Sequence, residues 1–459
     1  MPRRYCPRHR LAGLALLTLA VLLSTPRPAA TAQGLRVVDG AFQRDGQTYR
    51  GFGVNYYDAF LRTLRDGQDT SYDAGFAQLA QRGIPFARFN AGGYWPDDFG
   101  LYQTDKQEYF RRLDAVVASA QSHGVGLIPS VFWNHFTIAD LHGEAAGAWA
   151  DPASQTRQFA RQYAAELALR YRDSPAILMW EFGNEMNLFQ DLPTQNPDAS
   201  INVARGTPDQ RTDADKVSSN DVRDAVREFA TVVRGLDPDR PITTGHSVAR
   251  AQAYNLRNRG VFDQDQTFEF RALTAADHLD PNLPDNLPRN ELIDTLSVHA
   301  YWHSMLNVPR DDQNAPTRRF DRDDVTYRQV LDELITVSQQ SGKPLFVGEF
   351  GVADAFDFDL PDDQNSDNTD AERLRFLLET YLETDVPLAA LWVYDFQNPN
   401  ADIQRLGWNV TPDNDRAYQL DLLAEYNRRL LVPEPATAVW LTLCITAALP
   451  RRRASAHSR

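Results

Sequence analysis

Two glutamates stand at the ends of apolar segments that are typical of buried strands. Glu185 ends the segment WEFGNE at 180–185, and Glu349 ends VGE at 347–349. Burying a carboxylate costs free energy unless its charge is paired or used, so a glutamate in such a place is a candidate for chemistry. Two neighbouring carboxylates can act as acid/base and nucleophile in the retaining hydrolysis of a glycosidic bond, provided that the fold brings them together.

The elements that would position these glutamates recur along the chain as short β-rich segments, each followed by a pattern of helical period. Examples of the helical pattern are 109–124 and 222–236. Strands that alternate with helices predict a parallel sheet, and eight such units predict one closed (β/α)8 barrel, the TIM-barrel architecture. An open doubly wound sheet has less support, because the first strand-to-helix turn lacks G-x-G-x-x-G. The eight segments centre near Phe52, Phe86, Leu127, Leu178, Ile242, Ser297, Phe346 and Leu391.

Three stretches between these units are rich in Asp, Asn and Pro, and they predict long loops at 190–215, 255–290 and 355–372. In a (β/α)8 barrel the carboxyl ends of the strands face the active site. Glu185 and Glu349 lie at the ends of the fourth and seventh segments. The barrel therefore predicts that both carboxylates face one site, within a single catalytic domain at 33–431.

Motifs at several strand ends form one pattern: W-E-F-G-N-E-M-N, V-G-E-F-G, V-H-A-Y, F-A-R-F and R-G-F-G-V-N-Y. Together they resemble glycoside hydrolase family 5, the cellulase and mannanase group of clan A. The resemblance covers Arg50 to Phe396, and it implies that Glu185 is the acid/base and Glu349 the nucleophile.

The same resemblance implies supporting roles for five other residues. Asn184 would hydrogen-bond the sugar 2-hydroxyl, and Arg88 would keep the nucleophile ionised, since an adjacent guanidinium lowers a carboxyl pKa. His299 and Tyr301 would lie beside the nucleophile, with the Tyr301 phenol donating to one of its oxygens. Trp392 would form the floor under the reacting ring.

Other candidates rest on weaker signals. His135 ends the third segment and His246 follows the fifth, and either could contact substrate. Trp133, Trp95 and Trp302 are candidate sugar platforms, because aromatic faces suit the C–H faces of pyranose rings.

Two acids near the catalytic pattern have open roles. Glu181 lies deeper in the same strand as Glu185, and we interpret it as structural. Asp395 would either contact substrate or cap a loop.

Other kinds of chemistry have little support in the sequence. The segment HAYWH at 299–303 lacks the glutamate of a zinc-protease helix, and we find neither a G-x-S-x-G elbow nor a Walker loop. Both cysteines lie in the terminal segments, so we expect no thiol chemistry and no Cys-ligated metal in the body. A glycosidase of this kind also implies no other metal and no cofactor. The net charge of −15 understates the acidity of the body, because both ends are basic; such a body would repel nucleic acid.

Both ends of the chain have the composition of targeting segments. Residues 1–32 have a basic start, an apolar run and a small-residue cleavage site, as in a secretory signal peptide. Residues 432–459 resemble a PEP-CTERM sorting signal, with a Pro-Glu-Pro box, a short apolar helix and an Arg cluster. That resemblance implies transient membrane tethering, cleavage by an exosortase-type enzyme, and release to the cell surface or extracellular matrix.

The sequence thus predicts a secreted retaining β-glycosidase that acts on a β-linked polysaccharide or oligosaccharide. β-1,4-Mannan stands slightly ahead of β-1,4-glucan on general likeness, and endo and exo action are both open. Two alternatives share these residues: a transglycosylase that uses the same covalent intermediate, and a carbohydrate-binding matrix protein without turnover.

Overall fold

The computed structural model describes most of the chain between its two ends. Its described residues are 34–191, 200–249, 292–301, 326–353, 368–397 and 406–431. Residues 1–32 and 432–459, for which targeting roles are predicted, lie outside these ranges. Within the described part, no helix combines the length and the apolar composition needed to cross a membrane.

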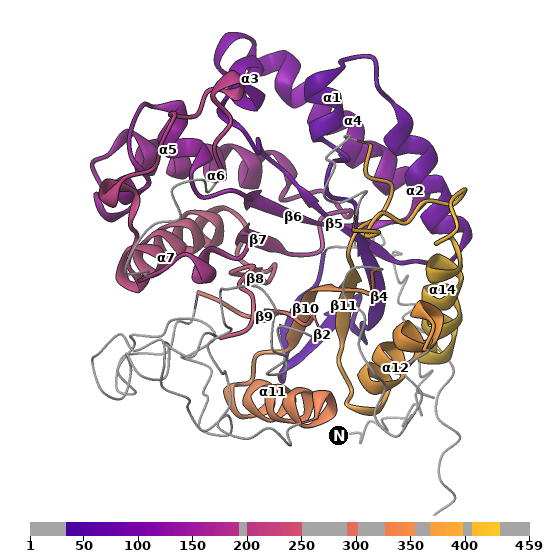
Figure 1. The fold of residues 1–459 in the computed structure, drawn as a ribbon. Helices are drawn as coiled ribbons and strands as arrows, with labels where there is room; N and C mark the ends of the chain where they lie inside the picture. The colour runs from indigo at the N-terminus through magenta and orange to yellow at the C-terminus, as the bar shows by residue number, and fades with distance from the viewer. Residues whose placement is uncertain are drawn as a thin grey trace, which may run out of the picture.

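Eight parallel strands form the centre of the molecule, and helices surround them (Figure 1). The hydrogen-bonded order is β8-β7-β6-β5-β4-β11-β10-β9. Two hydrogen bonds join the ends of this order, from Asp294 N to Ile242 O at 3.0 Å and from Thr243 Oγ1 to Thr295 O at 3.2 Å. The predicted (β/α)8 barrel is therefore confirmed as a nearly closed barrel. Its strands are β4 (Gly51–Asn55), β5 (Phe86–Asn90), β6 (Gly126–Phe132), β7 (Trp180–Gly183), β8 (Ile242–Thr243), β9 (Leu296–His299), β10 (Leu345–Phe350) and β11 (Leu388–Leu391).

The helices begin and end where local sequence signals place them. Asp105 accepts a hydrogen bond from Glu108 N at the start of α4 (Lys106–His123), and Gly124 ends that helix with a φ of 73°. Such a left-handed residue is a common helix stop, and it favours glycine. Asp221 completes a capping box at the start of α7 (Ser219–Leu236). The other described α-helices are α1 (Leu61–Arg65), α2 (Ser71–Gln81), α3 (Gly100–Thr104), α5 (Thr137–Leu141), α6 (Gln155–Tyr171), α11 (Tyr327–Ser341), α12 (Asp370–Glu383) and α14 (Tyr418–Leu431).

Apolar side chains fill both the space between strands and helices and the interior of the barrel. A short antiparallel sheet of β1 (Arg36–Val38), β2 (Ala41–Arg44) and β3 (Gln47–Thr48) precedes the barrel. Leu35 and Phe42 next to and within this sheet are buried together with barrel residues such as Phe86 and Phe346. This added sheet was not predicted, because its strands are too short to show a clear alternation.

The predicted loop at 355–372 ends earlier than expected, and the loop at 190–215 is attached to neighbouring elements. The stretch 355–372 overlaps α12, because Thr369 and Glu372 form a capping box that starts the helix before the acidic run ends. The described part of the loop at 190–215 contains two short 3-10 turns, η4 (Val203–Arg205) and η5 (Asp213–Asp215). The whole of 255–290 lies outside the described residues.

The loop after residue 200 is held by two arginines. The Arg211 guanidinium makes a bidentate ion pair with Asp140 on α5, with N–O distances of 2.6 and 2.8 Å. Arg205 pairs with Asp98 on η1 (Pro96–Phe99) at 2.6 Å. Since the Arg211 side chain is fully buried, this loop is anchored to the barrel's outer layer.

Candidate active site

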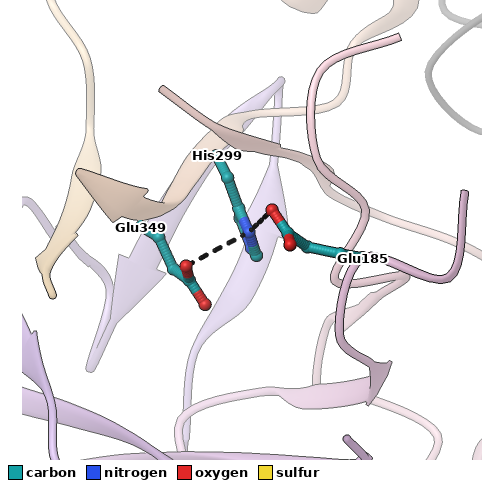
Figure 2. Close-up of side chains that lie close together, drawn as sticks. All are labelled: Glu185, His299 and Glu349. Carbon is teal, nitrogen blue, oxygen red and sulfur yellow. Dashed lines mark hydrogen bonds and ion pairs between the residues drawn. The ribbon is translucent and has the colours of Figure 1, made fainter. Parts of the chain in front are cut away.

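The two predicted catalytic glutamates meet at the carboxyl ends of their strands. Glu349 lies on β10 and is 5% exposed. Glu185 lies two residues beyond the end of β7, and its backbone N donates to Gly245 O at 2.8 Å. Its φ of 51° turns the chain sharply after the strand. The turn directs the Glu185 side chain toward β9 and β10 (Figure 2).

His299 on β9 lies between the two carboxylates. Its Nδ1 is 2.9 Å from Glu185 Oε1 and 3.5 Å from Glu349 Oε2. Figure 2 marks both interactions with dashed lines. Strand register explains this position, because His299 and Glu349 are paired residues of β9 and β10. One ligand atom from each of the three side chains lies within 4.8 Å of the others. The site therefore brings two carboxylates and an imidazole into one compact group.

Arg88 on β5 occupies the bottom of this group and is fully buried. Its Nη1 donates to Glu349 Oε1 at 2.8 Å and to Asn55 Oδ1 at 2.9 Å, while Nη2 donates to Asn184 Oδ1 at 2.7 Å. Its Nε donates to Glu181 Oε1 at 2.7 Å. The structure thus joins Arg88, Asn184 and Glu349 as predicted. It adds Asn55 and Glu181, which no single motif pointed to as partners of Arg88.

Tyr301 supplies a further contact to Glu349. Its phenol donates to Glu349 Oε2 at 2.8 Å, and its ring packs edge-on against Trp408 at 5.3 Å. Burial first, and then the negative charge of Glu349, raise the pKa of Tyr301 well above its usual value. The phenol therefore stays protonated and acts as a donor across the ordinary pH range.

Aromatic side chains flank the carboxylates on one side. Trp392, directly after β11, stacks on Trp133 with a ring separation of 6.0 Å and an interplanar angle of 28°. Trp133 is only 6% exposed, and the Arg88 guanidinium lies 4.3 Å from its ring centroid. The Trp133 ring thus contacts both the Arg88 guanidinium and the Trp392 ring. Sequence reasoning missed Tyr57, whose ring lies 4.8 Å from that of Trp133 and 5.9 Å from that of Trp392.

The remaining histidine candidates are buried. The His135 ring packs against Phe136 at 3.8 Å and Phe189 at 4.6 Å. Burial, with a further contribution from the charge of Arg211, lowers the pKa of His135 to about 3. His135 therefore stays neutral inside this packing. His246, just after β8, is 2% exposed. Contact of either histidine with substrate stays a prediction.

The other side chains singled out in the sequence have varied surroundings. Asp395 accepts from the Tyr56 phenol at 2.7 Å and from Arg62 at 3.1 Å, so it stabilises the loop after β11. Trp95 is half-buried beside Tyr94, at 4.9 Å between ring centroids. Trp302 lies outside the described residues.

The two carboxyl groups have opposite pKa shifts in this arrangement. Burial raises the pKa of Glu349, against the lowering effects of His299 and Arg88. Burial also acts to raise the pKa of Glu185, but the hydrogen bond and charge of His299 and a hydrogen bond from Ser247 outweigh it, so the net pKa is lowered. In the substrate-free site the higher pKa therefore belongs to Glu349 and the lower one to Glu185. The reason is geometric, since His299 lies closer to Glu185 than to Glu349.

Glu185, His299 and Glu349 also have the donor types and spacing of a minimal cation site. The cationic guanidinium of Arg88 and the phenol proton of Tyr301 both contact Glu349, however. These donors already neutralise and hydrogen-bond the carboxylate. The arrangement therefore suits proton sharing between the two carboxyl groups better than binding of a divalent ion.

Comparisons with known proteins agree with this geometry. The family model described as cellulase (glycosyl hydrolase family 5) matches residues 45–412. A probable mannan endo-1,4-beta-mannosidase A of Aspergillus oryzae is 29% identical over 182 residues, which are 35% of this chain and 46% of the relative. Mannan endo-1,4-beta-mannosidase A of Podospora anserina is 29% identical over 193 residues, 38% of this chain and 50% of the relative. The chain thus spans about half the length, or less, of these curated relatives.

Solved structures share the fold over a greater length. An endo-1,4-beta-mannanase from Rhizomucor miehei superposes with a TM-score of 0.57 at 14% identity, over 87% of this chain and 99% of that one. An exo-beta-1,4-mannosidase from Opitutaceae bacterium strain TAV5 superposes with a TM-score of 0.54 at 16% identity, over 86% of this chain and 63% of that one. At these sequence identities, the similarity to the two solved structures shows that the fold is shared.

Proposed function

The chain belongs to glycosyl hydrolase family 5, the cellulase family, and from this premise we propose that it is a retaining β-glycosidase. One observation carries the proposal. The carboxylates of Glu185 and Glu349 have oxygens within 4.8 Å of each other across the barrel mouth. Retaining enzymes hold their two carboxyl groups about 5 Å apart, whereas inverting enzymes leave roughly 6.5–9.5 Å for a water molecule. The spacing here therefore favours a covalent, double-displacement mechanism.

In the first step, Glu349 is the nucleophile and Glu185 the acid. A Glu349 oxygen bonds to the anomeric carbon while the glycosidic C–O bond breaks. The Glu185 proton passes to the departing oxygen, so the leaving group departs as a neutral alcohol. The product of this step is a sugar ester of Glu349 and an ionised Glu185.

In the second step, Glu185 acts as the base. It takes a proton from water, and the water oxygen bonds to the anomeric carbon as the ester bond to Glu349 breaks. Each displacement inverts the anomeric carbon, so the sugar is released with its original configuration. Both carboxyl groups return to their starting protonation states.

The mechanism requires the shared proton to be on Glu185 when substrate is bound. In the free site the pKa values favour the proton on Glu349. A glycosidic oxygen that accepts a hydrogen bond from Glu185 stabilises its protonated form, and a hydrogen bond to the neutral form raises a carboxyl pKa. Substrate binding would therefore move the proton to Glu185, whereas the empty site would hold it on Glu349.

The neighbouring side chains support the roles implied by the family. Arg88 and Tyr301 donate to different oxygens of Glu349, at 2.8 Å each, and orient it for attack. Arg88 also holds the Asn184 carbonyl, which leaves the Asn184 amide NH2 to donate to the sugar 2-hydroxyl. Trp392, stacked on Trp133, would provide the floor under the reacting ring.

For the substrate we propose a β-1,4-linked mannan or manno-oligosaccharide. The curated relatives reported above are named for mannan, and both solved neighbours are named as mannan-cleaving or mannoside-cleaving enzymes. β-1,4-Glucan is the second candidate, because the matching family model is named for cellulase. Transglycosylation would use the same covalent intermediate, with a sugar hydroxyl in place of water. A binding protein without turnover would not need this set of paired carboxylates.

We also propose that the protein is exported. Residues 1–32 would direct secretion, and residues 432–459 would tether the chain to the membrane until an exosortase-type enzyme cleaves it. The mature enzyme would then act at the cell surface or in the extracellular matrix. Detection of a processed form outside the cells, lacking both ends, would test this part of the proposal.

The function is tested by counting new reducing ends on β-mannan, β-1,4-glucan, β-1,3-glucan and xylan. We expect wild type to cleave β-mannan and Glu349→Ala to be inactive. Glu379→Ala is a matched control, because Glu379 forms a surface ion pair with Arg429 on α14 at 2.6 Å; it should keep wild-type activity. Turnover by folded Glu349→Ala at the wild-type rate would refute the assigned nucleophile, and release from glucan alone would reassign the substrate.

A further inference from the structure

A third glutamate is buried beneath the proposed catalytic pair. Glu181 lies on β7 and is fully buried, as is Arg88, to which it is paired. Its Oε1 accepts from Arg88 Nε at 2.7 Å. Its Oε2 is also buried and has no hydrogen-bond partner among the described residues. Burying a carboxylate costs free energy even when the carboxylate is paired with a cation. The presence of Glu181 at this buried position therefore calls for a functional reason.

The contacts of Arg88 show what Glu181 holds in place. A guanidinium is a rigid planar fork with five N–H donors. Here the donor on the stem, Nε, is bound by Glu181, and the two outer nitrogens reach Glu349 and Asn184. A fixed Nε sets the rotation of the whole plane. The direction in which both outer nitrogens point therefore depends on Glu181.

We propose that Glu181 is a positioning residue of the active site, which orients the Arg88 guanidinium toward Glu349 and Asn184 and balances the positive charge that Arg88 presents to the nucleophile. This inference rests on the proposed glycosidase function. Glu181 does not touch the reacting atoms in this arrangement. It acts through Arg88, the residue that contacts both Glu349 and Asn184.

The charge balance follows from counting the groups around the guanidinium. One cation lies between two buried carboxylates, at 2.7 Å from Glu181 and 2.8 Å from Glu349. Replacing Glu181 with glutamine keeps an oxygen that can accept from Nε but removes one negative charge. Because Glu181 and Glu349 contact the same guanidinium, the loss of the Glu181 charge removes repulsion of ionised Glu349 and should lower the pKa of Glu349 by about one to two pH units.

The other groups near Arg88 do not cancel this effect. The other titratable groups of the site are Glu185 in the turn after β7, His299 on β9 and Tyr301 two residues beyond the end of β9. The residues paired with Glu181 in the sheet are neutral, Ser130 on β6 and Thr243 on β8. Asn55 on β4, which is paired with Arg88, is neutral as well.

The first test is the pH profile of kcat/KM for Glu181→Gln on the polymer that wild type cleaves. We expect the alkaline midpoint to fall by about one to two pH units, because it reports Glu349, the carboxyl group with the higher pKa in the free site, and we expect the acid midpoint to fall by less. Midpoints within about 0.3 pH units of wild type would overturn the proposal. A merely structural role would lower stability without moving either midpoint.

The matched control is Glu228→Gln. Glu228 also pairs with a buried arginine, Arg157, at 2.8 Å, on the helices α7 and α6. The Glu228→Gln variant also removes one negative charge, but at a distance from the active site. The pH midpoints of its kcat/KM profile should therefore equal those of wild type. An equal shift in the control would assign the effect to net charge and overturn the proposal.

A second measurement does not depend on turnover. Carbon-13 NMR titration of the Glu349 carboxyl, assigned as the signal missing from Glu349→Gln, reports its pKa directly. If wild type cleaves no polymer, the proposed function fails, while a lower Glu349 midpoint in Glu181→Gln still supports the role of Glu181. An unchanged carboxyl titration would overturn that role whatever the activity.

Glu181→Asp covers the case in which the glutamine variant does not fold. Aspartate keeps the charge but is one methylene shorter, so it withdraws from Arg88 Nε. We expect kcat to fall by about 10- to 100-fold with pH midpoints close to wild type, because a misplaced guanidinium misorients Glu349. Wild-type kcat in this variant would refute the positioning role.

Discussion

Replacing Tyr301 with phenylalanine would isolate one hydrogen bond to the proposed nucleophile. The phenol donates to Glu349 Oε2 at 2.8 Å, and this bond acts to lower the pKa of Glu349. A hydrogen bond to a charged group contributes about 1.5–3 kcal/mol, and about 1.4 kcal/mol corresponds to one pKa unit. Its loss should therefore raise the pKa of Glu349 by about one to two pH units.

The assay is the pH dependence of kcat/KM, in which the alkaline limb reports Glu349, the free carboxyl group with the higher pKa. A still higher pKa of Glu349 moves this alkaline midpoint to higher pH, and it lowers the fraction of sites in which Glu349 is ionised while Glu185 is protonated. Below the new midpoint the variant should be about 10- to 100-fold slower than wild type. The direction is opposite to that expected for Glu181→Gln, so the pair of variants tests the sign of each effect as well as its size.

Tyr426→Phe is the control for this experiment. Tyr426 also donates from a mostly buried phenol to a carboxylate, Glu379 Oε2, at 2.9 Å, but on the outer helices α14 and α12. Its pH profile should match that of wild type. An alkaline midpoint that is unchanged or lower in Tyr301→Phe, with the protein folded, would refute the reasoning that the phenol stabilises ionised Glu349.

Three further predictions concern stability and orientation. Burial raises the pKa of Glu349, so the folded chain binds that proton more tightly than the unfolded chain, and wild type should lose stability as pH rises from about 4 through the raised pKa. The Tm advantage of Glu349→Gln should therefore grow between about pH 4 and 7, and an advantage that shrinks would contradict the direction given for Glu349. Arg211→Met leaves Asp140 without its bidentate partner, so the free energy of unfolding measured in urea should fall by about 3–5 kcal/mol. The variant should also be cleaved faster by proteases within 200–217, and cleavage at the wild-type rate would contradict the anchoring role of Arg211. Arg88→Lys cannot reach Glu181, Glu349 and Asn184 together, so kcat should fall by about 100-fold with KM little changed, and a change in KM alone would assign Arg88 to substrate binding.

Local patterns in the sequence were enough to locate the strands and the residues at their ends. All eight predicted segments contain or adjoin a barrel strand, from β4 around Phe52 to β11 at Leu391. Buried strands leave continuous apolar runs, and helices leave caps such as Asp105 and Gly124, so these elements can be recognised without knowledge of their neighbours. The terminal targeting segments and the roles of His135 and His246 in binding stay predictions.

The candidate site could be predicted only in part. The motifs identified Arg88, Asn184, His299 and Tyr301 beside the two glutamates, and the structure brings all of them together. The supporting position of Trp133, between Arg88 and Trp392, was not predictable. Nor was the pairing of Asp395 with Arg62, because neither residue carries a local signal of its partner.

Contacts between distant parts of the chain explain this division. Arg88 and Glu349 are 261 residues apart, and Arg88 and Glu181 are 93 apart; only the curvature and register of the sheet bring them within 2.8 Å. The directions of the two carboxyl pKa shifts depend on burial, on His299 and on Arg88, which the fold brings together at this site. The sequence by itself determined which groups stand at the strand ends. The tertiary structure alone decided how their charges are shared, because electrostatic interactions depend on distances that the linear order of residues does not contain.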